Sequence, residues 1–163
     1  MQATKDSFYV TLRDRLAQAY PARTITVDGI TRPAIVVVEN DKPSVTARQH
    51  DAFYLEWGDA HVVQPATSIL MAVTCTMSYA SAGTEQNGGL DRGRMIGELE
   101  SELLAICSPA VTHKSDYTVS GDPPYLGTEV FWGRPMFRTA KAAAGCVARE
   151  ASVTVYFYPE VSQ

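Results

Sequence analysis

The sequence predicts an α+β fold, a mixed or antiparallel β-sheet with two helices packed on one face, plus long loops or arms. Two segments, 6–19 and 90–107, repeat apolar residues with helical spacing, whereas several other segments are rich in β-forming residues. The strand candidates cluster along the chain and helices are few, which favours a sheet covered by helices on one side. A length of 163 residues suits a single domain over residues 1–163.

The first helix is expected from Asp6 to Ala19. Phe8, Leu12 and Leu16 recur at every fourth position, so they form one apolar stripe along the helix. A stripe of this kind indicates a helix that packs against a hydrophobic core.

The second helix is expected from about Leu90 to Cys107. Its core stripe consists of four apolar residues at helical spacing: Met95, Leu99, Leu103 and Ile106. Glu98, Glu100 and Glu102 are expected to form a solvated side of this helix.

A β-hairpin is predicted around Asp28 and Gly29, which lie between two β-rich runs. The pair suits a type I′ turn, because both central residues of that turn need a positive φ. Pro33 cannot donate a ladder hydrogen bond, so it is expected at the start of the second strand or on an edge. Residues 34–38 are continuously apolar, which suits a strand covered on both faces. Residues 52–57 are either a short strand or the ordered part of a long loop.

The longest strand candidate runs from Thr67 to Ala80. One face carries larger apolar residues: Ile69, Met71, Val73, Cys75, Met77 and Tyr79. The other face carries no charged residue: Ser68, Leu70, Ala72, Thr74, Thr76 and Ser78. An uncharged face suits contact with protein, either the chain's own loops or a neighbouring subunit. Thr74, Thr76 and Ser78 are therefore candidate interface residues.

The length of this strand is itself informative. At about 3.4 Å per residue it would reach about 48 Å, so it either bends round the core or projects from it. Two further strands are expected within residues 128–138 and 151–160. Residues 108–126 are expected to form a loop with a turn at the sequence SGDPP.

The segment from Gly133 to Glu150 joins two predicted strands and is rich in small residues. It also carries four basic residues: Arg134, Arg138, Lys141 and Arg149. Two interpretations stay open, an Ala-rich helical turn and a long arm that orders against another subunit. The second interpretation makes these four residues and Phe137 candidate contacts to a subunit or to a tube.

No catalytic, cofactor-binding or metal-binding site is predicted. The histidines His50, His61 and His113 are spaced by 11 and 52 positions, which matches no usual ligand pair. Cys107 and His113 could be paired as a nucleophile and base, but nothing in the sequence orients them. The glycine-rich segment 87–94 is more typical of a flexible turn than of a phosphate-binding loop. An enzyme or a small-molecule-binding domain is thus the least favoured alternative.

Composition narrows the classes of protein that remain. Apolar residues make up 45% of the chain and charged residues 20%, which is typical of a globular protein. The net charge of -4 argues against a surface that binds duplex DNA. The three cysteines, Cys75, Cys107 and Cys146, indicate a reducing compartment. We expect no secretion signal and no membrane span.

The order of these elements resembles the tail-terminator proteins of long-tailed bacteriophages. The resemblance begins with the helix of Phe8 to Ala19, the strand and turn of Ile25 to Gly29, and the sequence PAIVVV at residues 33–38. The long alternating strand, the acidic helix GELESELLAIC and the closing segment ASVTVYFYPE continue it in the same order.

The resemblance implies a virion protein of the tail that assembles in the host cytoplasm. Its copies would form a homohexameric ring that caps the tail tube, stops tube polymerisation and offers its other face to head–tail connector proteins. The implied partners are other copies of the chain, the tail tube protein and the connector proteins. DNA would pass through the pore without specific binding, and no membrane is involved. The alternatives within the virion are another head–tail connector, a neck protein or a tail tube protein.

Overall fold

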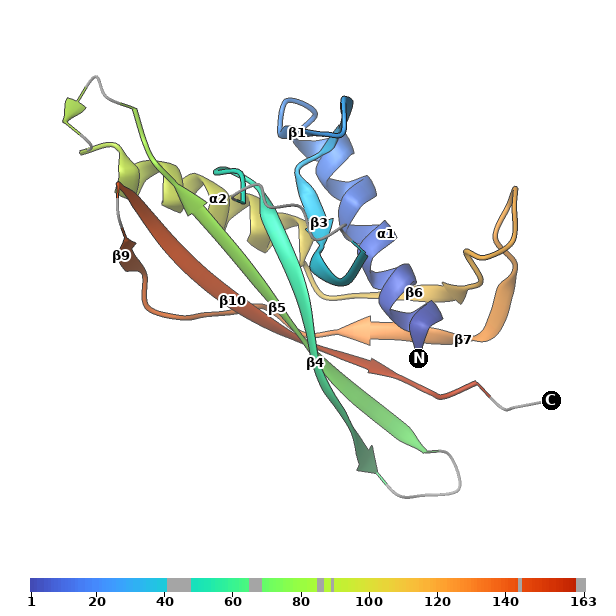
Figure 1. Ribbon diagram of the computed structural model, residues 1–163. Helices are drawn as coiled ribbons and strands as arrows, with labels where there is room; N and C mark the ends of the chain where they lie inside the picture. The colour runs from blue at the N-terminus through green and yellow to red at the C-terminus, as the bar shows by residue number, and fades with distance from the viewer. Residues whose placement is uncertain (41–47, 65–68, 85–86, 89, 144, 161–163) are drawn as a thin grey trace.

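The computed structural model describes residues 1–40, 48–64, 69–84, 87–88, 90–143 and 145–160. Helices and strands cover most of the chain (Figure 1). In chain order they are α1 (Gln2–Ala19), β1 (Thr24–Val27), β2 (Ile30–Pro33), β3 (Ile35–Val37), the short 3-10 helix η1 (Val38–Asn40), β4 (Phe53–Gln64), β5 (Leu70–Ser81), α2 (Arg92–Ile106), β6 (Ala110–Ser115), β7 (Tyr125–Trp132), β8 (Met136–Phe137), β9 (Lys141–Ala143) and β10 (Cys146–Phe157).

The strands form one large curled sheet and a separate hairpin. The large sheet has the order β3-β4-β5-β10-β7-β6, and β8 and β9 also pair with β10. The β3–β4 pair is parallel and the other pairs are antiparallel. Both helices lie on the same side of this sheet (Figure 1) and contribute to one core. The predicted α+β class is confirmed.

Helix α1 packs through the predicted stripe, since Phe8, Leu12 and Leu16 are fully buried. The Phe8 ring lies edge-on to Trp57 of β4 and to Trp132 of β7, with centroid separations of 5.6 Å and 5.0 Å. The Phe8 side chain of α1 therefore packs against strands from two different parts of the sheet. Aromatic pairs in this arrangement add about 1 kcal/mol beyond the area that they bury.

Helix α2 buries most of its predicted stripe, but its expected solvated side is only partly so. Glu98 is exposed as expected, whereas Glu100 is partly buried and binds Arg149, and Glu102 is buried beside Arg23. The Arg23 Nε and Nη2 atoms each donate to one Glu102 carboxylate oxygen at 2.8 Å. This hydrogen bond, opposed by burial, raises the pKa of Arg23. Helical periodicity alone does not show a partner 79 positions away, which is why Glu102 was expected to be solvated.

The predicted hairpin is confirmed as β1–β2. Asp28 and Gly29 have φ angles of 50° and 78°, as a type I′ turn requires. Pro33 ends β2 instead of starting it and lies opposite Thr24 in a two-stranded ribbon, where both strands are edges. The following strand, β3, is buried at all three positions, as the apolar run predicted.

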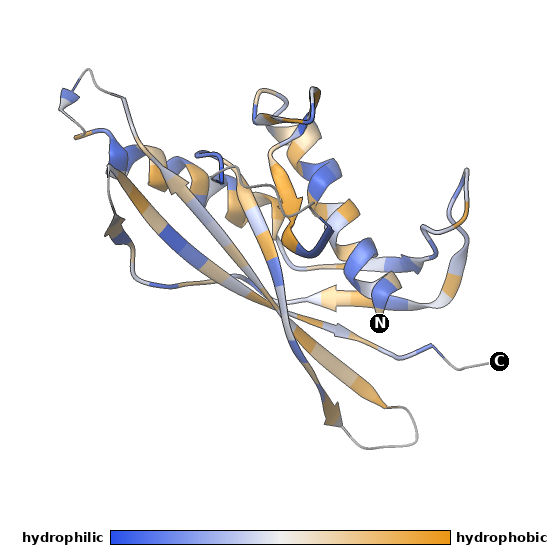
Figure 2. Ribbon diagram, in the orientation of Figure 1, coloured by the Kyte–Doolittle hydropathy of each residue, from blue (hydrophilic) through white to orange (hydrophobic). Residues whose placement is uncertain are grey.

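Segment 52–57 belongs to a long strand, because β4 runs for 12 residues and pairs with the 12 residues of β5. Both strands extend past the core and form a projecting hairpin, whose exposed side chains include Val62, Val63 and Ile69. Figure 2 shows hydrophobic colour at this projecting end of β5. The predicted long strand thus projects, while its expected first residues, Thr67 and Ser68, lie outside the described residues.

Two expectations in the second half of the chain are wrong. Residues 108–126 contain a strand, β6, which pairs with β7 on the far edge of the sheet. The described residues of segment 133–150 contain no helix, because β8 and β9 fold back along β10, which begins at Cys146 and not at Ala151. Gly145 has a φ of 77° and permits the tight turn from β9 into β10. Short alanine side chains in this segment gave no β-alternation to detect.

A buried lysine ties the end of β10 to β6. The Lys114 side chain is fully buried, and its ammonium donates to the Tyr158 carbonyl oxygen and lies 3.2 Å from the Glu160 carboxylate. The Met1 amino group contacts the same carboxylate at 2.8 Å. Burial raises the pKa of Glu160, but the hydrogen bonds from both ammonium groups outweigh it and lower that pKa to about 2.

Replacing Arg23 by Ala is expected to lower the free energy of unfolding by about 2 kcal/mol or more, because Glu102 would remain buried without its partner. Urea denaturation at neutral pH measures this change. The double variant Arg23→Met with Glu102→Leu is the control, and we expect it to lie within about 1 kcal/mol of the native chain. An equal loss in both variants would contradict a role for the ion pair.

The stabilising contribution of Glu160 is expected to depend on pH. The folded-state pKa lies below the ordinary value, so the contribution is complete above about pH 4.5 and is lost as the pH falls toward about 2. The carboxylate is 38% exposed, and solvent screening limits the effect at pH 7 to about 1 kcal/mol or less. Thermal unfolding of the native chain and of Glu160→Gln between pH 2 and 7 tests this, and a pH-independent difference would argue against it.

Candidate functional site

The face of the sheet opposite the helices, here called the open face, presents a strip of hydroxyl groups. Thr74, Thr76 and Ser78 of β5 lie beside Thr154, Ser152 and Glu150 of β10, respectively. All six are partly exposed, whereas the intervening residues of β5 point into the core under the helices. The strand β5 carries no charged residue over its whole length, so the predicted uncharged face is present in the structure.

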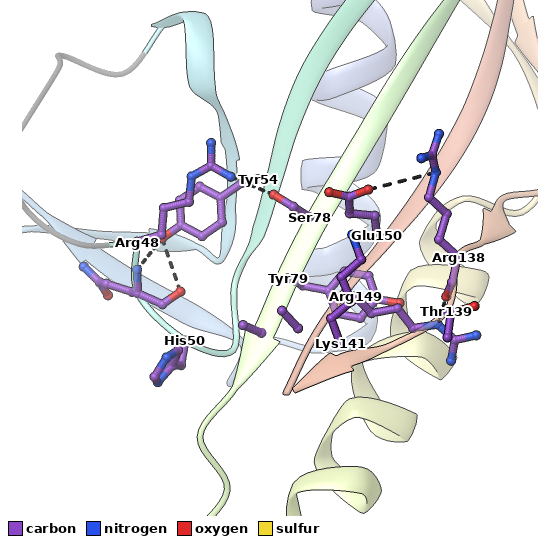
Figure 3. Close-up of a pocket in the computed structure, with 13 residues that line it drawn as sticks. Arg48, His50, Tyr54, Ser78, Tyr79, Arg138, Thr139, Lys141, Arg149 and Glu150 are labelled. Atoms are coloured by element: carbon purple, nitrogen blue, oxygen red, sulfur yellow. Dashed lines mark hydrogen bonds and ion pairs between the residues drawn. The ribbon is translucent and has the colours of Figure 1, made fainter. Parts of the chain in front are cut away.

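A pocket of about 250 Å³ lies at one end of the open face (Figure 3). Its two walls are residues 48–50, which precede β4, and residues 138–141, which join β8 to β9. Side chains of β5 and β10 lie between these walls: Ser78, Ala80, Ala148 and Glu150. Segments that are about 90 positions apart in the sequence therefore meet across two central strands.

Arg48 forms the first wall and is held by several contacts. Its guanidinium binds the Glu56 carboxylate, donates to Ser78 Oγ at 2.9 Å and lies 5.2 Å from the centroid of the Tyr54 ring. The Tyr54 hydroxyl accepts a hydrogen bond from the Gln49 amide at 2.7 Å. The aromatic ring is nearly buried, so it supplies a fixed apolar surface beside the arginine.

The second wall carries two more cationic groups. Arg138 is 68% exposed, and its Nε atom lies 4.0 Å from the Glu150 carboxylate. Lys141 is exposed, and among the described residues its ammonium has no hydrogen-bond or ion-pair partner. The pocket therefore combines cationic walls, one carboxylate and an apolar floor, which is a surface suited to a polar or anionic ligand.

The structure brings together four of the eight candidate interface residues. Ser78, Arg138, Lys141 and Arg149 all line the pocket, and Thr74 and Thr76 continue from it along the open face. Phe137 instead packs against the core, and Arg134 is exposed outside the pocket. Arg149 lines the pocket next to these residues, but its guanidinium binds Glu100 of α2 on the helix side.

Most of the residues that line the pocket were not predicted from the sequence, among them Arg48, Tyr54 and Glu150. Arg48 precedes residues 52–57, which were left open as a strand or a loop, so its neighbours across the sheet were unknown. Only the register of β5 against both β4 and β10 places these side chains around one cavity.

The residues considered for chemistry lie in separate environments. Cys107 is fully buried, where burial raises the pKa of its thiol to about 12. His113 is exposed on β6, and its Nδ1 atom lies 3.0 Å from Glu129. Among the described residues, no group of three or more His, Cys, Asp or Glu side chains could hold a metal ion.

Comparison of the chain with protein-family models and with curated proteins gave no match. Within the described part of the chain, no helix has the length and apolar character to cross a membrane.

Arg149 is expected to hold the second wall in place. Its Nε atom donates to the Arg138 carbonyl at 2.6 Å, and its guanidinium also lies over the Phe137 ring and binds Glu100. The Arg149→Ala variant should lose about 1–2 kcal/mol of stability and should show faster hydrogen exchange at the Arg138 amide, which donates to the Glu150 carbonyl. Arg134→Ala removes an exposed arginine of the same segment and should change neither quantity. Unaltered exchange in Arg149→Ala would show that β8 and β9 are held without it.

Proposed function

We propose that this protein is a structural virion component, a phage tail terminator whose copies form a ring. The ring caps the tail tube, stops its polymerisation and provides the surface that joins tail to head. The observation that carries the proposal is the open face, where β5 presents an uncharged row of side chains that the helices of the same chain leave uncovered. The order of elements, which resembles that family, supports the same function.

The open face is physically suited to contact with protein. Hydroxyl groups can exchange hydrogen bonds with water for hydrogen bonds with a partner, whereas charged groups would carry a much larger desolvation cost. Thr74 pairs with Thr154 and Thr76 with Ser152, so the strip is continuous across two strands. A partner that covers these two pairs of residues meets hydroxyl groups and no charged side chain among them.

The projecting hairpin of β4 and β5 adds a second contact surface. Val62, Val63 and Ile69 are 45–50% exposed near its end, beyond the reach of the core. Exposed aliphatic groups that are buried by a neighbour stabilise the contact by about 25 cal/mol for each Å² removed from water. An extension of this kind suits an assembly in which each copy reaches over the next.

A terminator works by shape and not by chemistry. Head-to-tail contacts between copies close into a ring when the rotation from one copy to the next divides a full turn. A closed ring has no free subunit interface in its own plane, and growth along the tube ends when the face turned away from the tube does not accept a further tube subunit. The enzyme alternative would instead require an activated group, and the thiol of Cys107 is held protonated by burial.

The proposal is tested by the mass of the purified protein in solution, followed by electron microscopy. We expect a single ring, a hexamer with a central opening. Tubes of indefinite length would favour a tail tube protein instead. A protein that stays monomeric at high concentration would overturn the proposal.

The Thr74→Lys variant is expected to prevent ring formation while leaving the subunit folded. Thr74 is partly exposed, so a lysine can reach solvent in the free subunit, but its charge would be trapped when a neighbour covers the open face. Light scattering and circular dichroism measure the two properties separately. Ala17→Lys on the exposed side of α1 makes the same change in charge elsewhere and serves as the control. Intact rings in Thr74→Lys would remove the open face from the interface.

A further inference from the structure

The pocket at the end of the open face has more cationic than anionic side chains around it. Arg48, Arg138 and Lys141 reach it from the two walls, and Glu150 is the carboxylate among its lining residues. Arg48 is already bound to Glu56, and Arg138 is only loosely paired with Glu150 at 4.0 Å. Lys141 has no partner among the described residues. The second wall therefore has free donors for one more anionic group.

The charges around the pocket and its volume limit which anionic group it can bind. Glu150 lies among the lining residues and Glu56 beside Arg48, so a phosphate with a charge near -2 would meet two carboxylates that repel it. A single carboxylate has half that charge and accepts hydrogen bonds from cationic side chains, as the Glu56 carboxylate does from the Arg48 guanidinium here. A volume of about 250 Å³ is below the range of about 300–1,000 Å³ for drug-sized ligands, and it suits one side chain with its adjoining backbone.

We propose that this pocket binds the carboxylate of an acidic peptide segment, with Lys141 and Arg138 as the groups that contact it. Ser78 and Glu150 lie between Arg138 and the nearly buried Tyr54 ring, which packs against Arg48 on the other wall (Figure 3). The proposal of a carboxylate site depends only on the pocket. Its assignment to a neighbouring copy, argued next, rests on the proposed ring.

The chain itself presents a segment with this chemistry. The turn between β6 and β7, residues 116–124, contains two aspartates and no lysine or arginine. Asp116 is held within the turn, since its carboxylate accepts hydrogen bonds from the amide and the hydroxyl of Thr118 at 2.9 Å and 2.6 Å. Asp122 is exposed and has no such partner among the described residues. Its carboxylate is the free acidic group of this turn.

The placement of the turn favours a contact between copies. It lies at the opposite end of the molecule from β9 (Figure 1), whose first residue, Lys141, lines the pocket. A segment at one end and its complementary pocket at the other end suit a head-to-tail contact, the type that builds rings. Val119 of the turn and the adjoining Tyr125 are half exposed and are available for apolar contact with the surface around the pocket. Asp122 of one copy is thus assigned to the pocket of the next.

The first experiment tests the carboxylate site. The Asp122→Asn protein is titrated with the peptide acetyl-Ser-Gly-Asp-Pro-Pro-amide, and binding is followed by saturation-transfer difference NMR of the peptide. We expect binding that Lys141→Glu, added to Asp122→Asn, weakens roughly tenfold or more, whereas Arg134→Glu leaves it unchanged. Equal binding of a control peptide with Asn in place of Asp, or no binding of either peptide, would overturn the proposal.

The second experiment identifies the source of the carboxylate in the full-length protein. Asp122→Lys and Lys141→Glu should each reduce the fraction of rings measured by light scattering, and the double variant should recover it because the charges are exchanged. Full assembly of both single variants together with peptide binding would show that a different protein supplies the carboxylate, which overturns the assignment to Asp122. Rings that form without any peptide binding would overturn the pocket proposal and leave the terminator function standing.

Discussion

The antiparallel pairing of β5 with β10 is the constraint on which the rest of the structure depends. It runs from Met71 and Phe157 at one end to Ser81 and Val147 at the other. Because side chains alternate along both strands, this single register directs one set of residues into the core and the other set to the open face. A slip by one residue in either strand would exchange hydroxyl groups for core side chains. The helices, the open face and the pocket all require this one alignment.

Local patterns in the sequence predicted the helices and strands that have one buried side and one exposed side, and the turn that requires a positive φ. The stripe of α1, the turn at Asp28 and Gly29, and the alternation of β5 are all visible in short windows because each has a buried and an exposed side, or a required φ. The strand β6 was missed since its exposed residues include Val111, which blurs the alternation. Burial of Glu102 was missed for a different reason, because its partner Arg23 lies far away in the sequence, in the loop between α1 and β1.

The candidate site was predictable only in part. The uncharged face and the basic segment 133–150 were apparent from composition, and the structure places Ser78, Arg138 and Lys141 around one cavity. The cavity itself depends on how β8 and β9 fold back along β10 and on how Arg48 reaches Ser78 across β4. Those are long-range alignments, and no local pattern encodes them.

Neutral and charged surfaces lie apart on this molecule, and the two kinds of surface would affect the alignment of two copies differently. A hydroxyl-lined face offers area but tolerates several alignments, because threonine and serine hydroxyls accept and donate in many geometries. Charged groups tolerate far fewer alignments, since each misaligned pair leaves a buried charge without a partner. The structure places Arg138 and Lys141 at one end of the open face and keeps β5 neutral. In such an arrangement the neutral face supplies the contact area, and the charged end determines which alignment of two copies is accepted.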